Sequence, residues 1–158
     1  MTHPTPCIHG SCSLRRRALL RLCAAGAGGL LPITSVAQPR TDIVQPANPG
    51  PQAFMARAFE LRERAIRLGD QPYGAVVVRN GRIVGEAASA VVVANDPTAH
   101  AEMEAIRDAA RRLKTRDLSG CELYGTSRAC PMCESAAYWA RIARLRYGET
   151  ITDGGAPR

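Results

Sequence analysis

A β-hairpin signal in the middle of the chain limits the folds that the sequence can adopt. Two runs of β-branched and small residues, at 74–79 and 82–87, flank the dipeptide Asn80-Gly81, which favours a tight turn between two antiparallel strands. Apolar residues recur at helical spacing on both sides of this hairpin, from Phe54 to Gly69 and from Pro97 to Lys114. The hairpin is therefore expected between two amphipathic helices.

The rest of the chain continues the alternation of strands and helices. Short strands are expected at 121–126 and 143–147, with a helix at 131–140 between them. Asp96 and Pro97 suit the cap and the first residue of the helix that ends near Lys114. A length of 158 residues is typical of one domain. This order of elements predicts an α/β fold in which helices cover a sheet.

Residues 1–37 have the three parts of a bacterial export signal. Arg15-Arg16-Arg17 precedes a mildly apolar stretch at 22–31, and Ser35-Val36-Ala37 supplies the small residues of a cleavage site. The arginine pair resembles the twin-arginine type, which predicts export to the periplasm. The apolar stretch is too short and too rich in glycine for a transmembrane span. The alternative is a disordered basic N-terminus or a wrongly assigned start codon, which would leave the protein in the cytoplasm.

The positive charge of the chain is concentrated in this leader. Residues 1–37 hold four arginines and no acidic residue, whereas 38–158 hold 17 basic and 14 acidic residues, a formal charge of +3. This modest excess argues against a nucleic-acid partner. Four prolines within 38–51 indicate a linker, so the catalytic or binding domain is expected at 52–158.

One histidine and two cysteines carry the main chemical signal. After residue 37 the chain has a single histidine, His100, and Cys130 and Cys133 form a Cys-x-x-Cys pair at a predicted helix start. Such a pair alone could be a redox motif or half of a structural zinc knuckle. A four-cysteine knuckle needs a second pair, and only Cys121 remains. One imidazole and two thiolates suit tetrahedral zinc with one open position, which is a catalytic arrangement. The helix starts and, for the cysteines, the metal itself are expected to favour the thiolate form.

Glu102 follows His100 by two residues on the same predicted helix. A carboxylate that lies beside a zinc site without binding the metal can move protons in a hydrolytic reaction. The alternatives are that Glu102 is a surface residue or a fourth zinc ligand.

These residues resemble the zinc-dependent cytidine and nucleobase deaminases, whose signature is His-x-Glu followed by Pro-Cys-x-x-Cys. The segments 95–102 and 130–141 look most similar to the guanine deaminase and tRNA adenosine deaminase branch, and the similarity runs from about Phe54 to Tyr147. The resemblance implies a three-layer α/β/α fold of the cytidine deaminase type and one Zn²⁺ ion as cofactor.

The resemblance also assigns roles to individual residues. It implies zinc binding by His100, Cys130 and Cys133. It implies that Glu102 carries a proton from water to the ring nitrogen of the substrate and then to the departing ammonia.

Three departures from the branch affect the expected substrate site. Arg128 and Ala129 precede Cys130 where the branch usually has Glu-Pro. Ser89 stands where the branch commonly has a base-reading asparagine, so Ser89 and Ala101 are the candidate substrate contacts. The chain ends at Arg158, soon after the last predicted strand, where family members usually continue with another helix and strand. A fold truncated at its C-terminus is therefore expected.

Other marked residues are expected to have structural roles. Tyr138, Trp139 and Cys121 are expected to pack inside the domain. The basic run at 111–116 is expected to end a helix and to be balanced by acidic residues on it, and a phosphate-binding patch is the alternative.

Three functions remain open from the sequence. The first is a zinc hydrolase that deaminates a small nucleobase or nucleoside, with a guanine-like purine preferred. The second is a deaminase of adenosine in tRNA or another RNA, and the third is a non-catalytic zinc-stabilised binding domain. The expected partners are a small substrate and a possible second copy in a homodimer.

Overall fold

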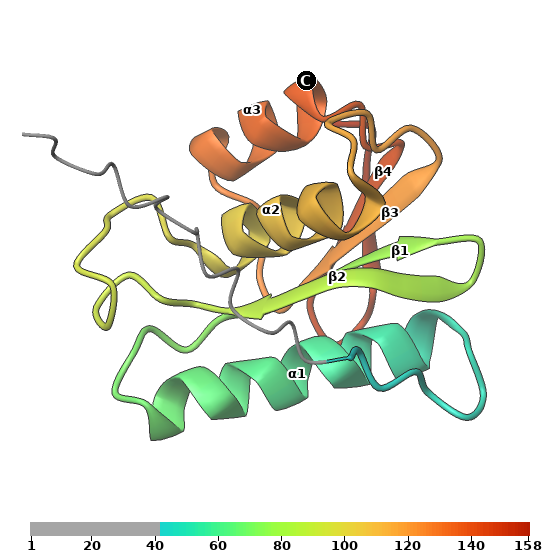
Figure 1. Cartoon of the computed structure of the whole chain (residues 1–158). Coiled ribbons are helices and arrows are strands. Elements are labelled where there is room, and N and C mark those ends of the chain that lie inside the picture. The colour runs from blue at the N-terminus through green and yellow to red at the C-terminus, as the bar shows by residue number, and fades with distance from the viewer. Residues whose placement is uncertain (1–41) are drawn as a thin grey trace, which may run out of the picture. The chain divides into compact units, whose positions relative to one another are not determined.

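The computed structural model describes residues 42–158, which form three helices and five strands (Figure 1). The predicted export signal at 1–37 lies outside the described residues. Within the described part, no helix has both the length and the apolar character needed to cross a membrane. The elements are α1 (Pro51–Arg67), β1 (Gly74–Arg79), β2 (Arg82–Ala88), α2 (Ala101–Leu113), β3 (Cys121–Gly125), α3 (Pro131–Trp139), β4 (Arg144–Tyr147) and β5 (Thr152–Gly155).

The strands form one mixed sheet in the order β2-β1-β3-β4-β5. β1 is antiparallel to β2 and β3, β3 is parallel to β4, and β4 is antiparallel to β5. The predicted hairpin is confirmed, because Asn80 and Gly81 have φ angles of 49° and 71°, as a type I′ turn requires. Since β3 and β4 are parallel, their carboxyl ends meet at one edge of the sheet, and α3 begins just after β3 at that edge.

Helices cover both faces of the sheet, which confirms the three-layer α/β/α expectation (Figure 1). On one face, Val76 and Tyr124 cluster with Phe54 of α1. On the other face, Val77 and Leu123 cluster with alanines of α2 and α3. Side chains alternate between the two faces of a strand, so the consecutive valines of β1 supply two separate cores.

Two glycines allow the helices to pack closely against the sheet. A Cβ atom at Gly74 would lie 2.1 Å from the carbonyl oxygen of Ala58 in α1, and one at Gly85 would lie 2.5 Å from the backbone nitrogen of Ala109 in α2. Neither position has room for a side chain. The spacing of both helix layers therefore depends on these two residues.

The structure corrects two predicted boundaries and adds a strand. α2 begins at Ala101, not at Pro97, because the Asp96 carboxylate accepts hydrogen bonds from the N–H and the hydroxyl of Thr98, both at 2.7 Å. Those bonds hold a separate turn, and His100 becomes the cap of α2. α1 begins at Pro51, ahead of the expected Phe54. β5 has no counterpart among the predicted elements.

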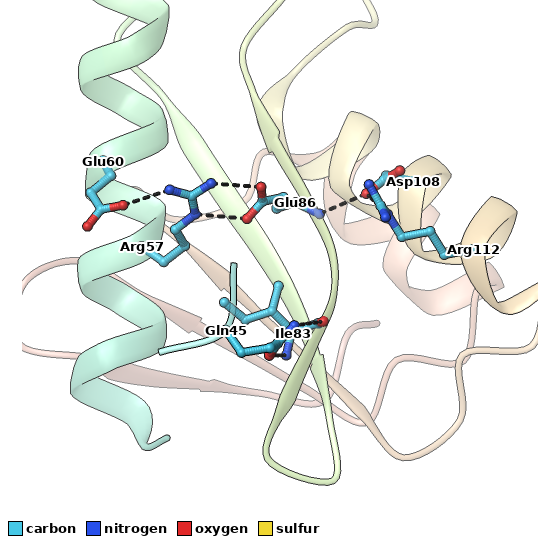
Figure 2. Close-up of polar contacts among 7 residues, drawn as sticks. All are labelled: Gln45, Arg57, Glu60, Ile83, Glu86, Asp108 and Arg112. Atoms are coloured by element: carbon cyan, nitrogen blue, oxygen red, sulfur yellow. Dashed lines mark hydrogen bonds and ion pairs between the residues drawn. The ribbon is translucent and has the colours of Figure 1, made fainter. Parts of the chain in front are cut away.

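Side chains from three segments hold the edge strand β2 in place (Figure 2). The Gln45 side chain bonds to both the N–H and the C=O of Ile83, each at 2.9 Å. Arg57 of α1 donates two hydrogen bonds of 2.8 Å to Glu86, whose backbone N–H donates to Asp108 of α2 at 3.2 Å. Paired backbone groups make an edge strand less open to association with other chains. Gln45 lies in the segment 38–51, which was expected to be a linker, so part of that segment is attached to the domain by these bonds.

Candidate metal centre and active site

The candidate ligands come together because two helices begin close to each other. His100 is the N-cap residue of α2 and Cys130 is the N-cap residue of α3, and both have extended backbone angles. Cys133 is the third residue of α3, and the two helices pack against each other. The loops that follow β2 and β3 thus deliver one imidazole and two thiols to one place.

The spacing of the three donor atoms fits a tetrahedral zinc ion. His100 Nδ1 lies 3.7 Å from the Sγ atoms of both Cys130 and Cys133, and the two Sγ atoms are 3.6 Å apart. Zinc–sulfur bonds of about 2.3 Å at tetrahedral angles would place two ligand sulfurs about 3.8 Å apart. Among residues 42–158, these three form the group whose donor atoms all lie within 4.8 Å of one another. Three protein ligands leave one position of a tetrahedral ion for water or substrate.

Cys133 depends on a cation to become a thiolate. Burial raises the pKa of the Cys133 thiol, and the neighbouring Glu102 carboxylate and Cys130 raise it further. Desolvation opposes the helix dipole at Cys133, so the thiolate expected from the helix start and the metal together rests on the metal. A divalent cation reverses this balance, so zinc binding is expected to displace the proton of Cys133.

Glu102 lies between the thiols and the carboxyl end of β3. Its side chain is buried, with 6% of the residue exposed, so it is not a surface residue. Oε2 lies 3.7 Å from Cys133 Sγ, and Oε1 would lie 3.4 Å from a Cβ atom placed on Gly125. Glu102 does not belong to the mutually close donor group of the described residues, which disfavours the fourth-ligand alternative.

Burial also sets the protonation behaviour of Glu102. Desolvation raises the pKa of its carboxyl above the ordinary range, against a backbone N–H, the Cys133 thiol and His100, which lower it. A carboxyl whose pKa is raised toward neutrality is suited to accept and return a proton.

A cavity opens beside Glu102 at the carboxyl ends of β3 and β4. It is small, with a volume of about 20 Å³, and its wall includes Glu102, Gly125, Ser127, Arg128, Glu134 and Tyr147. The location agrees with the rule that sites in α/β proteins gather where parallel strands end.

The charged groups on this wall differ in how they are paired. Arg146 donates a hydrogen bond of 2.8 Å to Glu122, so its charge is balanced within the sheet. The side chains of Arg128 and Glu134 make no hydrogen bond or ion pair with other described residues. Arg128 therefore has free donors and Glu134 free acceptors at the cavity.

The two candidate substrate contacts, Ser89 and Ala101, do not line the cavity beside Glu102. Ser89 is 2% exposed, and its hydroxyl donates to Asp70 Oδ1 at 2.8 Å. It is not part of the cavity wall beside Glu102. Ala101 is fully buried in the core that α2 and α3 share, and it is not part of that cavity wall either.

The structure also corrects the roles expected of some aromatic and basic residues. Tyr138 and Trp139 do not pack inside the domain, because they are 52% and 79% exposed. Cys121 is fully buried, as expected. Arg112 pairs with Asp108 of the same helix at 2.7 Å, which agrees with a balanced helix end.

Sequence reasoning missed two groups of residues near the site. Glu134 and Tyr147 line the cavity, but nothing in their local pattern distinguishes them from surface positions. Asp70 is buried and accepts the Ser89 hydroxyl. The one available signal was its place directly after the helix-ending Gly69.

Comparison with known proteins agrees with this geometry. Residues 50–149 match the model of the cytidine and deoxycytidylate deaminase zinc-binding region. The chain is 44% identical over 96 residues to a tRNA-specific adenosine deaminase of Aquifex aeolicus, covering 61% of this chain and 64% of the relative. It is 42% identical over 103 residues to a guanine deaminase of Bacillus subtilis, covering 65% and 66%.

Solved structures give the same family and the same fold. The guanine deaminase of Bacillus subtilis superposes with a TM-score of 0.58 at 43% identity, covering 60% of this chain and 61% of that one. A guanine deaminase from Nitrosomonas europaea superposes with a TM-score of 0.62 at 28% identity, covering 66% and 61%. The chain spans just under two thirds of the length of the curated relatives it matches. It belongs to the cytidine and deoxycytidylate deaminase family and carries that family's zinc-binding region.

Proposed function

We propose that the protein is a zinc-dependent hydrolytic deaminase of a nucleobase or nucleoside, with a guanine-like purine as the preferred substrate. The observation that carries the proposal is the buried carboxylate of Glu102, 3.7 Å from one of three donor atoms spaced for tetrahedral zinc. A purely structural zinc site uses four protein ligands and has no use for a buried acid beside it.

In this proposal His100, Cys130 and Cys133 hold the metal. Zinc in such a site supplies Lewis acidity, which makes a water molecule nucleophilic near neutral pH. Glu102 takes a proton from that water and passes it to the ring nitrogen next to the attacked carbon. The water oxygen bonds to the carbon that carries the amino group, and the carbon–nitrogen bond breaks. Glu102 then takes the second proton, from the hydroxyl group added to that carbon, and gives it to the amino group, which departs as ammonia and leaves an oxo group on the ring.

The position of Arg128 at the cavity beside Glu102 supports a purine with acceptor atoms on its outer edge. Arg128 lines this cavity and has no partner among the described residues. A guanidinium can donate two parallel hydrogen bonds to the O6 and N7 atoms of guanine. When the amino-bearing C2 carbon faces Glu102, O6 and N7 lie on the far side of the base, where such a donor would act. Guanine deaminases among the relatives add to this preference.

Deamination of adenosine in tRNA is the second candidate, since relatives at 44% and 40% identity are named tRNA-specific adenosine deaminases. A formal charge of +3 on residues 38–158 gives this candidate little electrostatic support. A non-catalytic zinc-stabilised domain is the third candidate, and the burial of Glu102 weighs against it.

Export to the periplasm is part of the proposal, with 1–37 as the signal, 38–51 as a linker and 52–158 as the deaminase domain. The twin-arginine route carries folded proteins, so zinc could be inserted before export. We also expect a homodimer, since Tyr138 and Trp139 form an exposed aromatic pair, and sedimentation velocity would detect it.

Ammonia release from a panel of substrates tests the proposed activity. The zinc-loaded full chain is incubated with guanine, adenine, cytosine, their nucleosides and an unmodified tRNA, and ammonia is measured enzymatically. Release from guanine or guanosine above the other compounds is the expected result. Release from tRNA alone would favour the second candidate, and no release from any compound would favour the non-catalytic domain.

A further inference from the structure

We propose that Asp70 is a positioning residue for the metal site, because its buried carboxylate organises the loop that places His100. The inference depends on His100 as a zinc ligand and not on the deamination reaction. It therefore stands or falls separately from the proposed substrate.

The end of α1 fixes the position of Asp70. The N–H of Gly69 donates to the C=O of Ile66 at 3.0 Å, and the N–H of Asp70 donates to the C=O of Ala65 at 2.9 Å. Together with the φ of 73° at Gly69, these bonds form a Schellman motif, a standard way to end a helix. The Asp70 side chain therefore starts from a rigid backbone.

The Asp70 carboxylate accepts four hydrogen bonds in a buried place. Oδ1 accepts the Gln71 N–H at 2.7 Å and the Ser89 hydroxyl at 2.8 Å. Oδ2 accepts the N–H groups of Val92 and Val93, both at 2.9 Å. Asp70 and Ser89 are 8% and 2% exposed, so water has little access to this pair, and losing the carboxylate would leave the Ser89 hydroxyl unpaired.

Val92 and Val93 belong to a helical turn that leads toward the metal site. The C=O of Ala90 accepts the N–H of Ala94 at 2.9 Å, so Asp70 caps the free N–H groups at the start of this turn. The N–H of Ala90 in turn donates to the C=O of Ala99 at 3.0 Å. That bond closes the loop one residue before His100.

The histidine ligand and the two cysteine ligands are thus supported by different segments. Cys130 caps α3 and Cys133 lies within it, and none of the hydrogen bonds of Asp70 described above leads to α3. Asp70 is linked to the backbone of His100 by two sets of hydrogen bonds. The first joins its carboxylate to the turn at Val92, and the second joins the N–H of Ala90 to the C=O of Ala99. Loss of Asp70 should loosen the histidine ligand and leave the two thiol ligands in place.

The test measures how fast the folded, zinc-loaded chain releases zinc to a chromogenic chelator. Asp70→Ala should release zinc up to about tenfold faster than wild type, since losing a group bonded directly to a metal ligand costs about 10- to 100-fold in metal affinity and Asp70 acts on His100 through the loop. Asp70→Asn keeps the shape of the side chain but replaces one acceptor oxygen with an NH₂ group that faces N–H donors. It should therefore raise the rate of zinc release less than Asp70→Ala does. Ser89→Ala removes one of the four donors and should change release least.

Asp117→Ala is the matched control. Its carboxylate likewise accepts the N–H of a nearby loop residue, Ser119, at 2.9 Å, but this loop leads to β3 and not to a metal ligand. Hydrogen exchange of the Val92, Val93 and His100 amides is measured on the same samples. Circular dichroism confirms that each variant is folded, and Asp70→Asn replaces Asp70→Ala if the latter does not fold.

Faster zinc release with faster exchange at these amides, in the Asp70 variants and not in Asp117→Ala, would support the inference. Unchanged zinc release in a folded Asp70 variant would overturn it. Equal acceleration in Asp117→Ala would also overturn it, because it would show a general loss of stability in place of a positioning role.

Discussion

Substitution of Gly85 by alanine tests whether close packing of α2 on the sheet holds the domain together. A Cβ atom at this position would lie 2.5 Å from the backbone nitrogen of Ala109, 2.6 Å from the carbonyl oxygen of Ala105 and 2.6 Å from the Ala109 Cβ. Ordinary contacts between such atoms are about 3.5–4.0 Å long. Two of the opposing atoms belong to the helix backbone and cannot rotate away, so α2 must move outward by about 1 Å.

Overfilling a packed core costs about 1–3 kcal/mol, and the upper end applies here because backbone must shift. For a domain of this size, about 1 kcal/mol lowers the melting temperature by about 4 °C. Gly85→Ala should therefore lower the Tm of the zinc-loaded chain by about 10 °C, measured by circular dichroism.

The control for this substitution is Gly50→Ala. A Cβ atom there would meet nothing within 4 Å, and Gly50 has an extended φ of 178°, so only its role as the N-cap of α1 changes. A Tm within about 2 °C of wild type for Gly85→Ala, or an equal fall for Gly50→Ala, would refute the packing argument.

Two further predictions concern the metal and the leader. Elemental analysis should find no zinc in His100→Ala or in Cys133→Ala. The control is Cys121→Ala, which changes a buried cysteine outside the ligand group and should keep its zinc. Zinc at the wild-type level in both ligand variants would contradict the assignment. Mass spectrometry of the native protein should find an N-terminus near Gln38, and an intact N-terminus in the cytoplasm would contradict export.

The sequence predicted the elements whose signals are local. The Asn80-Gly81 turn and the helical spacing of apolar residues determine structure over a few residues, and both elements were confirmed. The predicted start of α2 was wrong because Asp96 and Pro97 favour a turn as well as they favour the start of a helix. What decided between them was the hydroxyl of Thr98, which bonds to Asp96.

The metal site was predictable because a histidine and a Cys-x-x-Cys pair are rare and have a definite chemistry. The supporting residues were not, since their roles depend on contacts between distant segments. Asp70 acts on residues more than 20 positions away, and Ser89 has its hydroxyl turned to Asp70 and not to the cavity. The exposure of Trp139 likewise depends on which face of α3 meets the sheet, which its sequence leaves open.

Ammonia production by wild type and Glu102→Gln at equal zinc content tests the central claim most directly. The substitution keeps the size of a side chain that is 6% exposed, so folding and zinc content should change little, and it removes the group that accepts and returns the proton. General acid and general base catalysis are each worth about 10²- to 10⁴-fold, so kcat should fall at least about 10³-fold, with a much smaller change in KM. Glu134→Gln, on the cavity wall, serves as the control and should keep kcat within about tenfold of wild type. Equal kcat values for wild type and Glu102→Gln would contradict the proposed mechanism.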